Sequence, residues 1–267
     1  MKFAVLYSKK DEAGINIAEQ LKEFYLPQVP IIELKKESIN CENIDETEEQ
    51  LKNIEFIIFA TKHRSESGKK SLSLHAPGNW RNADFGGKPG KICPTSAQAL
   101  KFLFQKLNEN AKQANYPHNI TLECTHHGPL INKPCCFIEL GSSEEGWKDK
   151  DAAKIVAKTI ADFQNFTTAQ KSKIKTAVGI GGPHYCPNFN KIQISETSGI
   201  AVGHIIPEYA LPLTENVLSE AIQKTREHTD ILLIDWKGCG NSESRKKIIE
   251  ILEKSGIPYE RAERIPK

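Results

Sequence analysis

The sequence predicts an α/β fold: a single domain with a central mixed, largely parallel sheet flanked by helices. Three observations indicate this. Short apolar runs typical of buried strands alternate with stretches whose apolar residues recur at helical spacing. The 267 residues are enough to bury one sizeable core. No internal repeat or low-complexity linker divides the chain. Because parallel strands need crossover connections, this alternation favours a parallel sheet.

The predicted strands are short apolar runs that end in polar or glycine-rich segments. In chain order they cover residues 3–7, 54–60, 119–122, 135–140, 176–180, 197–206 and 230–236. The predicted helices alternate with them and cover residues 17–25, 97–107, 152–163, 217–225 and 244–255. We expect Thr95 or Ser96 to cap the second helix, and Asp151 or an earlier acidic residue to open the third. Gly256 and Pro258 should end the last one.

Charge and composition limit the functional classes. The formal net charge is only +2, so any nucleic acid should bind a local patch and not the whole surface. No apolar run approaches the roughly 20 residues that span a bilayer. The opening residues run straight into charge, which is not typical of a signal peptide. Seven irregularly placed cysteines indicate reduced thiols. We therefore expect a cytoplasmic protein without membrane contact, and a monomer.

Histidines and glutamates lie just beyond or near the ends of several predicted strands. Burying such groups is costly unless something pairs with them. Because the ends of parallel strands gather at one edge of a sheet, several of these side chains should converge, which suits a metal site or an acid–base site. The candidates are His63, His75, Glu123, His126, His127, Glu139, His184 and His204.

The spacing of these residues leaves alternatives open. His126 and His127 are neighbours, so in an extended segment they point to opposite faces, unless the backbone turns at Gly128 and Pro129. The sequence has neither the helical His-Glu-x-x-His arrangement nor a Cys-x-x-Cys pair. Cys135 and Cys136 lie in an apolar run and are expected in the core. Spacing alone makes metal binding a moderate hypothesis.

Two further segments are candidates for substrate contacts. Gly181 and Gly182 predict a tight turn that lets a ligand approach the backbone and presents His184, although an ordinary strand-to-loop turn would look the same. Residues 62–90 concentrate Gly, Pro, Ser and Lys and predict a flexible basic loop. This loop is either a solvated face or a site for RNA phosphates and unstacked bases. Its basic and aromatic candidates are Arg64, Lys69, Lys70, Trp80, Arg81 and Phe85.

Five segments together resemble the D-aminoacyl-tRNA deacylases of the archaeal and plant type. They are TKHRSESGKKSLSLHAPGNW, CTHHGPLINKPCCFIELGSSEEGW, GIGGPHYCPNF, GIAVGHIIPEY and DWKG, and they run in order over residues 61–238. The combination of His-His-Gly-Pro, Phe-Ile-Glu-Leu-Gly-Ser and Gly-Gly-x-His-Tyr is specific, whereas each piece alone would be weak.

The resemblance implies hydrolysis of the ester between a D-amino acid and the 3′ end of tRNA, with zinc as cofactor. It also implies a one-domain fold similar to peptidyl-tRNA hydrolases and nucleoside phosphorylases. A zinc-bound water can attack an ester carbonyl, and Glu139 or Glu123 could take its proton. We infer catalytic roles for His126, His127, Glu139 and His184. We infer metal binding by His63, His75, Glu123 and His204. For tRNA we infer contacts from Arg64, Lys69, Lys70, Trp80, Arg81, Gly181 and Gly182, with Trp80 or Phe85 stacking on the terminal adenine.

Two other functions remain open at this point. The first is another hydrolase, such as a peptidyl-tRNA hydrolase or a metal-dependent amidase. The second is a non-catalytic RNA-binding protein whose histidines serve as stacking or structural groups. The balanced charge and the histidines near strand ends favour an enzyme.

Overall fold

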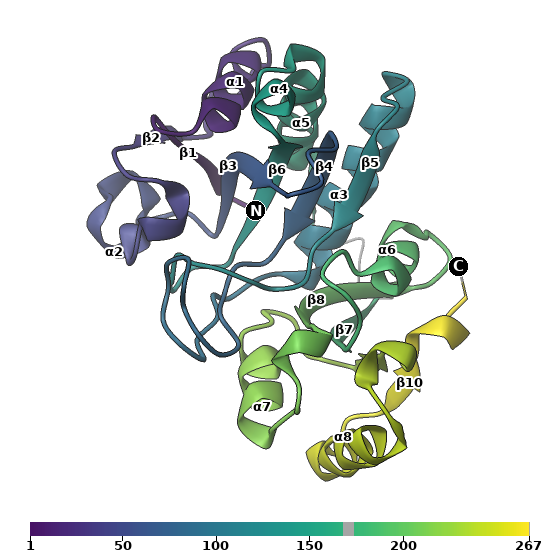
Figure 1. Ribbon diagram of the computed structural model, residues 1–267. Helices are drawn as coiled ribbons and strands as arrows, with labels where there is room; N and C mark the ends of the chain where they lie inside the picture. Colours follow the sequence, from purple (N-terminus) through teal and green to yellow (C-terminus); the bar gives the residue numbers. More distant parts are fainter. Residues whose placement is uncertain (168–173, 267) are drawn as a thin grey trace.

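The strands form two sheets in the computed structural model of the protein, which describes residues 1–167 and 174–266 (Figure 1). The larger sheet has the strand order β2 (Ile31–Leu34), β1 (Phe3–Ser8), β3 (Phe56–Arg64), β6 (Cys135–Ser142), β4 (Ser71–His75) and β5 (Asn119–Leu122). The smaller sheet has the order β10 (Tyr259–Arg261), β9 (Ile231–Ile234), β7 (Lys175–Ile180) and β8 (Ile200–Ile206). Within the described ranges every strand pair is parallel except β4 with β6.

Each of the five predicted helices overlaps an observed one. The observed helices are α1 (Glu12–Leu21), α2 (Ile44–Thr47), α3 (Ala97–Gln113), α4 (Glu144–Trp147), α5 (Lys150–Asp162), α6 (Pro187–Ile194), α7 (Glu215–Gln223) and α8 (Ser242–Ser255), of which α2, α4 and α6 were not predicted. The Ser96 side chain caps α3 by accepting from the Ala99 N–H, and Asp149 caps α5. Gly256 ends α8 with φ of 71°. The first helix begins and ends earlier than predicted, because it covers Glu12–Leu21 and leaves Tyr25 84% exposed.

The predicted α/β class with a largely parallel sheet is confirmed, and two features differ from the expectation. The strands divide between two sheets. In addition, β4 lies inside the segment predicted as a flexible loop, where it is buried between β5 and β6. Serines alternate with leucines in β4, so its sequence lacks the continuous apolar run of a central strand. The buried strand depends on partners that are distant in the chain.

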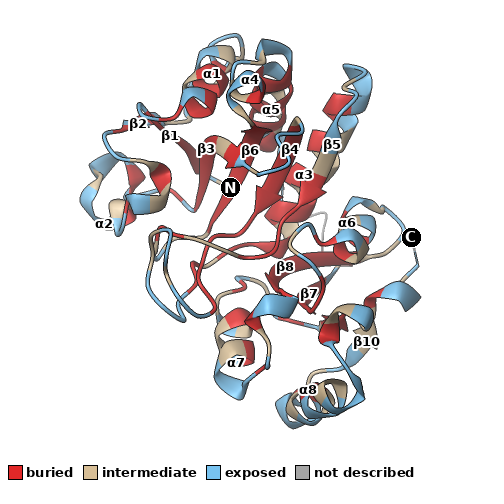
Figure 2. Ribbon diagram, in the orientation of Figure 1, coloured by how far each residue is buried: buried red, intermediate tan, exposed pale blue. Residues whose placement is uncertain are grey.

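Alternation along β3, β4 and β6 gives the two faces of the larger sheet different characters. One face packs Ile58, Leu74 and Ile138 into a cluster that also contains residues of α1, α3 and α5. The opposite face carries Phe59 and Phe137, whose stacked rings have centroids 4.7 Å apart. Figure 2 shows these strands as buried and the outer sides of the helices as exposed. The second face is where the polar candidates lie, because successive side chains of a strand point to opposite sides.

The apolar core also joins the two sheets. The cluster that contains Phe3 and Val5 of β1 continues to Val202 and Ile205 of β8 and to Leu233 of β9. We therefore propose that the chain is one domain, since a single core runs through both sheets. In the described ranges no helix combines the length and the hydropathy needed to cross a bilayer.

Candidate functional site

The candidate site lies where the two sheets meet. The segment that follows β5 is held by backbone hydrogen bonds to the smaller sheet and its loops: the Thr125 N–H donates to the Ile205 carbonyl at 3.1 Å, and the Cys124 N–H donates to the His184 carbonyl at 2.9 Å. From the other side, the Gly78 N–H donates to the His127 carbonyl at 2.6 Å. Side chains from both sheets therefore reach one place.

Glu139 is the first of two buried carboxylates. It lies in β6 beside Ser73 of β4 and Thr61 of β3, on the face opposite the α1–α3–α5 layer. The Ser73 hydroxyl donates to Oε2 at 3.1 Å. Nε2 of His75 lies 3.4 Å from Oε1, and Nε2 of His127 lies 3.8 Å from the same oxygen. The strand alternation that places Phe137 on this face thus also places Glu139 there.

Glu123 is the second buried carboxylate and is 2% exposed. His184 approaches Oε2 at 2.8 Å, and His126 approaches it at 3.5 Å. Nδ1 of His63 lies 3.0 Å from Oε1 of Glu123 and 3.3 Å from Oε2 of Glu139, so one imidazole bridges the two carboxylates. Despite that distance, Oε1 of Glu123 makes no hydrogen bond of good geometry.

The charges in this cluster depend on one another. Burial by itself would raise the pKa of Glu123 and of Glu139, but the histidines around them hold both pKa values well below the usual range. Burial by itself would lower the pKa of His63, but the close contacts with the negatively charged Glu123 and Glu139 raise it to about 11. Cys124 and Glu123 raise the pKa of His184 to about 10 against the effect of burial. The site therefore holds ionised carboxylates beside protonated His63 and His184.

Three other histidines are oriented differently. In each of them Nδ1 lies close to a backbone carbonyl. Nδ1 of His75 lies 3.2 Å from the Ala76 carbonyl, Nδ1 of His126 lies 2.9 Å from the Cys124 carbonyl, and Nδ1 of His127 lies 2.7 Å from the Gly128 carbonyl. A carbonyl oxygen can only accept, so each Nδ1 carries the proton, and Nε2 holds a lone pair when the ring is neutral. Burial, with the neighbouring His75 and His127, holds the pKa of His126 well below its usual range, so His126 is neutral.

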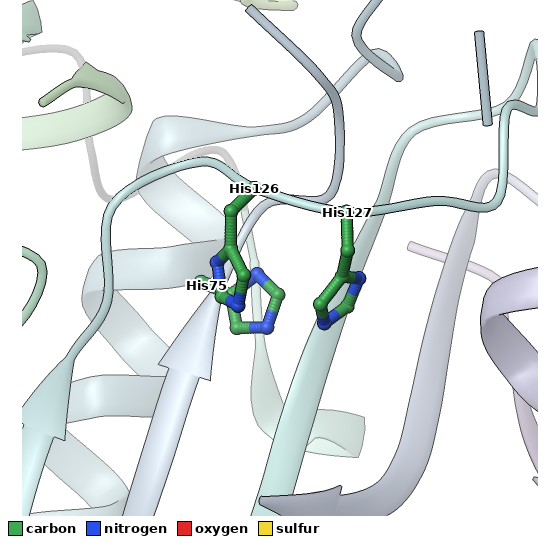
Figure 3. Close-up of side chains that lie close together, drawn as sticks. All are labelled: His75, His126 and His127. Carbon is green, nitrogen blue, oxygen red and sulfur yellow. The ribbon is translucent and has the colours of Figure 1, made fainter. Parts of the chain in front are cut away.

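The backbone at His127 explains how two adjacent histidines reach the same place. His127 has φ of 44°, a left-handed conformation that is uncommon outside glycine. The chain therefore does not alternate as an extended strand would, and both rings point towards the end of β4, where His75 lies (Figure 3). The ring centroids of His126 and His127 are 4.3 Å apart. A backbone turn was needed for both histidines to face the same side, and the structure has this turn at His127.

The donor atoms of the cluster fit a metal ion. Three groups bring one possible ligand atom from each member within 4.8 Å of the others: His75 with His126 and His127, Cys124 with His126 and His184, and His63 with Glu123 and Glu139. Imidazole nitrogen, thiolate sulfur and carboxylate oxygen are the usual zinc ligands. A backbone carbonyl that accepts the second N–H of a histidine is the usual support of such a ligand.

His204 was expected in this cluster but lies apart from it. Its ring is fully buried, with Nδ1 3.0 Å from the Thr125 hydroxyl and Nε2 3.3 Å from the Lys224 carbonyl. Among the described residues it belongs to none of the three groups of possible metal ligands. Burial lowers its pKa to about 4, so it is neutral. Its strand was predicted correctly, but its side chain joins β8 to the segment after β5.

The candidate tRNA contacts differ in their exposure and in the partners that they already have. Arg64 and Lys69 are exposed, whereas Lys70 pairs with Glu145 and Asp149 at 3.1 Å each. Arg81 donates from Nε and Nη2 to the Ala210 carbonyl. Trp80 is only 7% exposed, while Phe85 is 68% exposed.

The turn at Gly181 and Gly182 has the features of an ordinary strand-to-loop turn. Both glycines have positive φ values, 85° and 87°, but the space at their Cβ positions is filled by Cys239 and Asp235. The Gly181 N–H donates to the Ile206 carbonyl, and the Gly182 N–H donates to the Gly238 carbonyl. The two amides are therefore engaged within the protein, and glycine is needed here for close packing.

Sequence reasoning missed three residues of the site. Cys124 lies 3.5 Å from Nδ1 of His184 and 2.9 Å from the Tyr209 hydroxyl, measured from Sγ. The Tyr185 hydroxyl lies 3.2 Å from Nε2 of His63. Cys124 stands between Glu123 and His126 in the sequence and could have been suspected from that position. Nothing local identifies the tyrosines.

Comparisons with known proteins identify the family of the chain. Residues 50–260 match the family described as D-aminoacyl-tRNA deacylase. The D-aminoacyl-tRNA deacylase of Methanocaldococcus jannaschii is 34% identical over 269 residues, which cover 98% of this chain and 100% of that protein. The enzyme of the same description from Thermococcus kodakarensis is 35% identical over 275 residues, covering 96% and 98%. The crystal structure of AF0625, a conserved protein of unknown function, has a TM-score of 0.89 at 32% identity and covers 99% of this chain and 96% of that one. The chain therefore belongs to the D-aminoacyl-tRNA deacylase family, whose members are hydrolases of aminoacyl-tRNA esters.

Proposed function

We propose that the protein hydrolyses the ester between a D-amino acid and the 3′ end of tRNA, with the help of a bound zinc ion. The observation that carries the proposal is the convergence of two ionised, buried glutamates with five histidines at the junction of the sheets. Ester hydrolysis needs a proton acceptor for the attacking water, stabilisation of the oxyanion and a proton donor for the leaving group. Membership of the family supports the choice of substrate.

The chain's own residues can supply the proton transfers. Glu123 and Glu139 are held ionised, so either carboxylate can accept the proton of the attacking water. His184 is held protonated and its side chain is 35% exposed, so it can donate a proton to the departing 3′ oxygen. His63 stays buried between the carboxylates and fixes their positions. The products are the free D-amino acid and the tRNA.

Zinc would be held by Nε2 of His75, His126 and His127. The three carbonyl-bound Nδ1 atoms support this choice, because they place the lone pair of each neutral ring on Nε2, the atom that would coordinate. Without a cation, the lone pair of neutral His126 faces a carboxylate oxygen of Glu123, an unfavourable contact that a metal would relieve. When bound, zinc supplies Lewis-acid polarisation of a carbonyl and lowers the pKa of a coordinated water.

The proposal extends to partner, location and assembly. The partner is tRNA charged with D-amino acids, which the exposed Arg64 and Lys69 would help to bind through phosphates. A cytoplasmic location is supported by the seven cysteines, which are all buried and unbridged. A monomer is supported by the exposed large apolar side chains, which stand in separate segments of the described chain.

The test is deacylation of D-tyrosyl-tRNA by the purified chain, with and without a chelator. We expect rapid release of D-tyrosine, loss of activity after chelation, recovery with zinc, and bound zinc by elemental analysis. L-Tyrosyl-tRNA and N-blocked peptidyl-tRNA serve as competing substrates. Faster turnover of the blocked substrate would identify a peptidyl-tRNA hydrolase instead. Binding of tRNA without turnover of any ester would contradict the hydrolase proposal.

A further inference from the structure

A pocket of about 260 Å³ opens directly beside the histidine cluster. One wall is formed by residues 78–84 and the other by Tyr209 and Ala210. Thr125, His126 and His127 also line it. The pocket is thus continuous with the site through the two histidines, while most of its lining has no part in the chemistry described above.

Hydrogen bonds fix the two walls of the pocket to each other. Arg81 donates from Nε and Nη2 to the Ala210 carbonyl at 3.3 and 3.2 Å, which ties the first wall to the second. The Gly78 N–H donates to the His127 carbonyl, and the Asn79 side chain donates to the Gly86 carbonyl at 2.8 Å. The cavity is therefore formed before a ligand arrives, as is usual for small-molecule sites.

Trp80 lines this pocket and a neighbouring one, and it carries a donor that the protein does not use. The side chain is 93% buried, since only 7% is exposed, yet its Nε1 makes no hydrogen bond. A buried indole N–H normally finds an acceptor, because leaving it unpaired is unfavourable. The ring packs edge-on against His204, with centroids 6.1 Å apart. Trp80 is thus suited to donate a hydrogen bond to a ligand and is too buried to serve as an open stacking platform.

Tyr209 offers the stacking surface that Trp80 lacks. It is 56% exposed, and its hydroxyl is anchored 2.9 Å from Sγ of Cys124. Its ring lies nearly parallel to that of His184, at 24° and with centroids 6.4 Å apart. An exposed aromatic ring with a fixed orientation can stack on a base at little entropic cost.

The residues that line the pocket suit a nucleoside better than a phosphate or an amino-acid side chain. A wall that contains the Asp84 carboxylate disfavours a phosphate group by repulsion. The polar side chains of Asn82 and Asp84, with the unpaired N–H of Trp80, would hinder a pocket that must accept many amino-acid side chains. They suit a base and a ribose, which carry several hydrogen-bonding groups of their own.

We propose that this pocket binds the 3′-terminal nucleoside of the tRNA, with the Trp80 N–H donating to an acceptor on that nucleoside and Tyr209 stacking on its base. The inference rests on the proposed function, because the terminal ribose carries the ester and must lie next to the reacting groups. A pocket bordered by His126 and His127 meets that requirement. Tyr209 thereby takes the stacking role that the sequence led us to expect of Trp80 or Phe85.

The proposal is tested with free adenosine as the probe, in two measurements on the whole chain. Binding is measured by titration calorimetry, and inhibition is measured against D-tyrosyl-tRNA. Adenosine should bind wild-type protein and compete with the substrate. Trp80→Phe, which keeps a ring but removes the N–H, and Tyr209→Leu should each weaken adenosine binding by about 10-fold. Both should raise KM more than they lower kcat. Tyr25→Leu, which alters an exposed tyrosine outside the pocket, should match wild type.

Several outcomes separate the possibilities. Failure of adenosine to bind wild-type protein, or equal binding by wild type and both folded variants, would overturn the proposal. Altered preference among D-amino acids with unchanged adenosine affinity would assign the pocket to the amino-acid side chain and equally overturn it. If Trp80→Phe does not fold by circular dichroism, Tyr209→Leu decides alone. Absence of turnover in wild type would reject the proposed function, while the calorimetric result would still decide whether the pocket takes the nucleoside.

Discussion

His184 lies 2.8 Å from Glu123, measured from Nε2 to Oε2, and this contact joins the loop after β7 of the smaller sheet to the segment after β5 of the larger one. Because the carboxylate is buried and ionised, the contact is a charge-assisted hydrogen bond, stronger than one between neutral groups. The catalytic arrangement therefore depends on how the two sheets dock. Changes at this contact should affect turnover and stability together.

The first prediction concerns Glu123→Gln, which keeps the shape of the side chain and removes its charge. Deacylation should fall by at least about 100-fold, because His184 and His63 lose the charge that holds them protonated and oriented. Unfolding free energy should fall by about 3 kcal/mol, the usual cost of breaking a buried pair. Steady-state kinetics and urea denaturation measure the two effects. Glu66→Gln, in an exposed loop, is the matched control. A stable and active Glu123→Gln enzyme would show that the Glu123 charge is not required for catalysis.

The second prediction concerns the histidines that we propose as zinc ligands. His126→Ala and His127→Ala should each lower zinc content per chain and reduce turnover by at least about 100-fold. Elemental analysis gives the metal content independently of activity. His118→Ala, at an exposed position, should retain full zinc and activity. If both variants keep their metal, the zinc would lie in the group of His63, Glu123 and Glu139, which contains neither histidine.

The third prediction concerns tRNA phosphates. Arg64→Gln combined with Lys69→Gln should raise KM more than it lowers kcat, and the slope of log KM against log salt should fall by roughly 0.7 to 0.9 for each phosphate that is no longer neutralised. Lys70→Gln should have a smaller effect, because Lys70 already pairs with Glu145 and Asp149. Lys22→Gln combined with Lys112→Gln controls for the overall charge. An unchanged salt slope would place the tRNA backbone on another surface.

The fourth prediction concerns stability at acid pH. Burial depresses the pKa of His204 from 6.5 to about 4 in the folded protein. The unfolded chain therefore binds more protons between these values, so the contribution is fully present above about pH 6.5 and is lost as pH falls towards 4. The change is at most about 3 kcal/mol. Because the site carboxylates also titrate at acid pH, the measurement is the difference in unfolding free energy between wild type and His204→Gln. That difference should vary with pH over this window, and a constant difference would contradict the prediction.

The fold and the site could be predicted from the sequence to different extents. Strands such as β3 and β7 carry continuous apolar runs. The length of each run and the polar or glycine-rich residues that follow it are enough to locate the strand. The positions near strand ends and the motifs led us to expect six histidines in one place, and the structure brings five of them together; they are His63, His75, His126, His127 and His184. The conformation of His127 could not be predicted in this way, because a positive φ in a non-glycine residue depends on its surroundings. His204 shows the same limit: its strand is predictable, but the direction of its side chain depends on how β8 meets Thr125.

The last prediction concerns chirality. D- and L-residues on the same ester carry identical groups, so discrimination needs a wall that collides with the L side chain and leaves room for the D side chain. Backbone suits such a wall better than a flexible side chain. Gly128 lies beside His127 and is packed so closely that an added Cβ would come within 2.3 Å of the Gly87 nitrogen. Its N–H also donates to the Phe85 carbonyl at 2.9 Å, so the segment cannot easily retreat. We therefore expect strong rejection of L-aminoacyl-tRNA, with glycine, which has no side chain to exclude, as the commonest error. Kinetics on D-alanyl-, L-alanyl- and glycyl-tRNA measure this directly. Equal rates on the D and L esters would refute stereochemical selection even if ester hydrolysis itself were established.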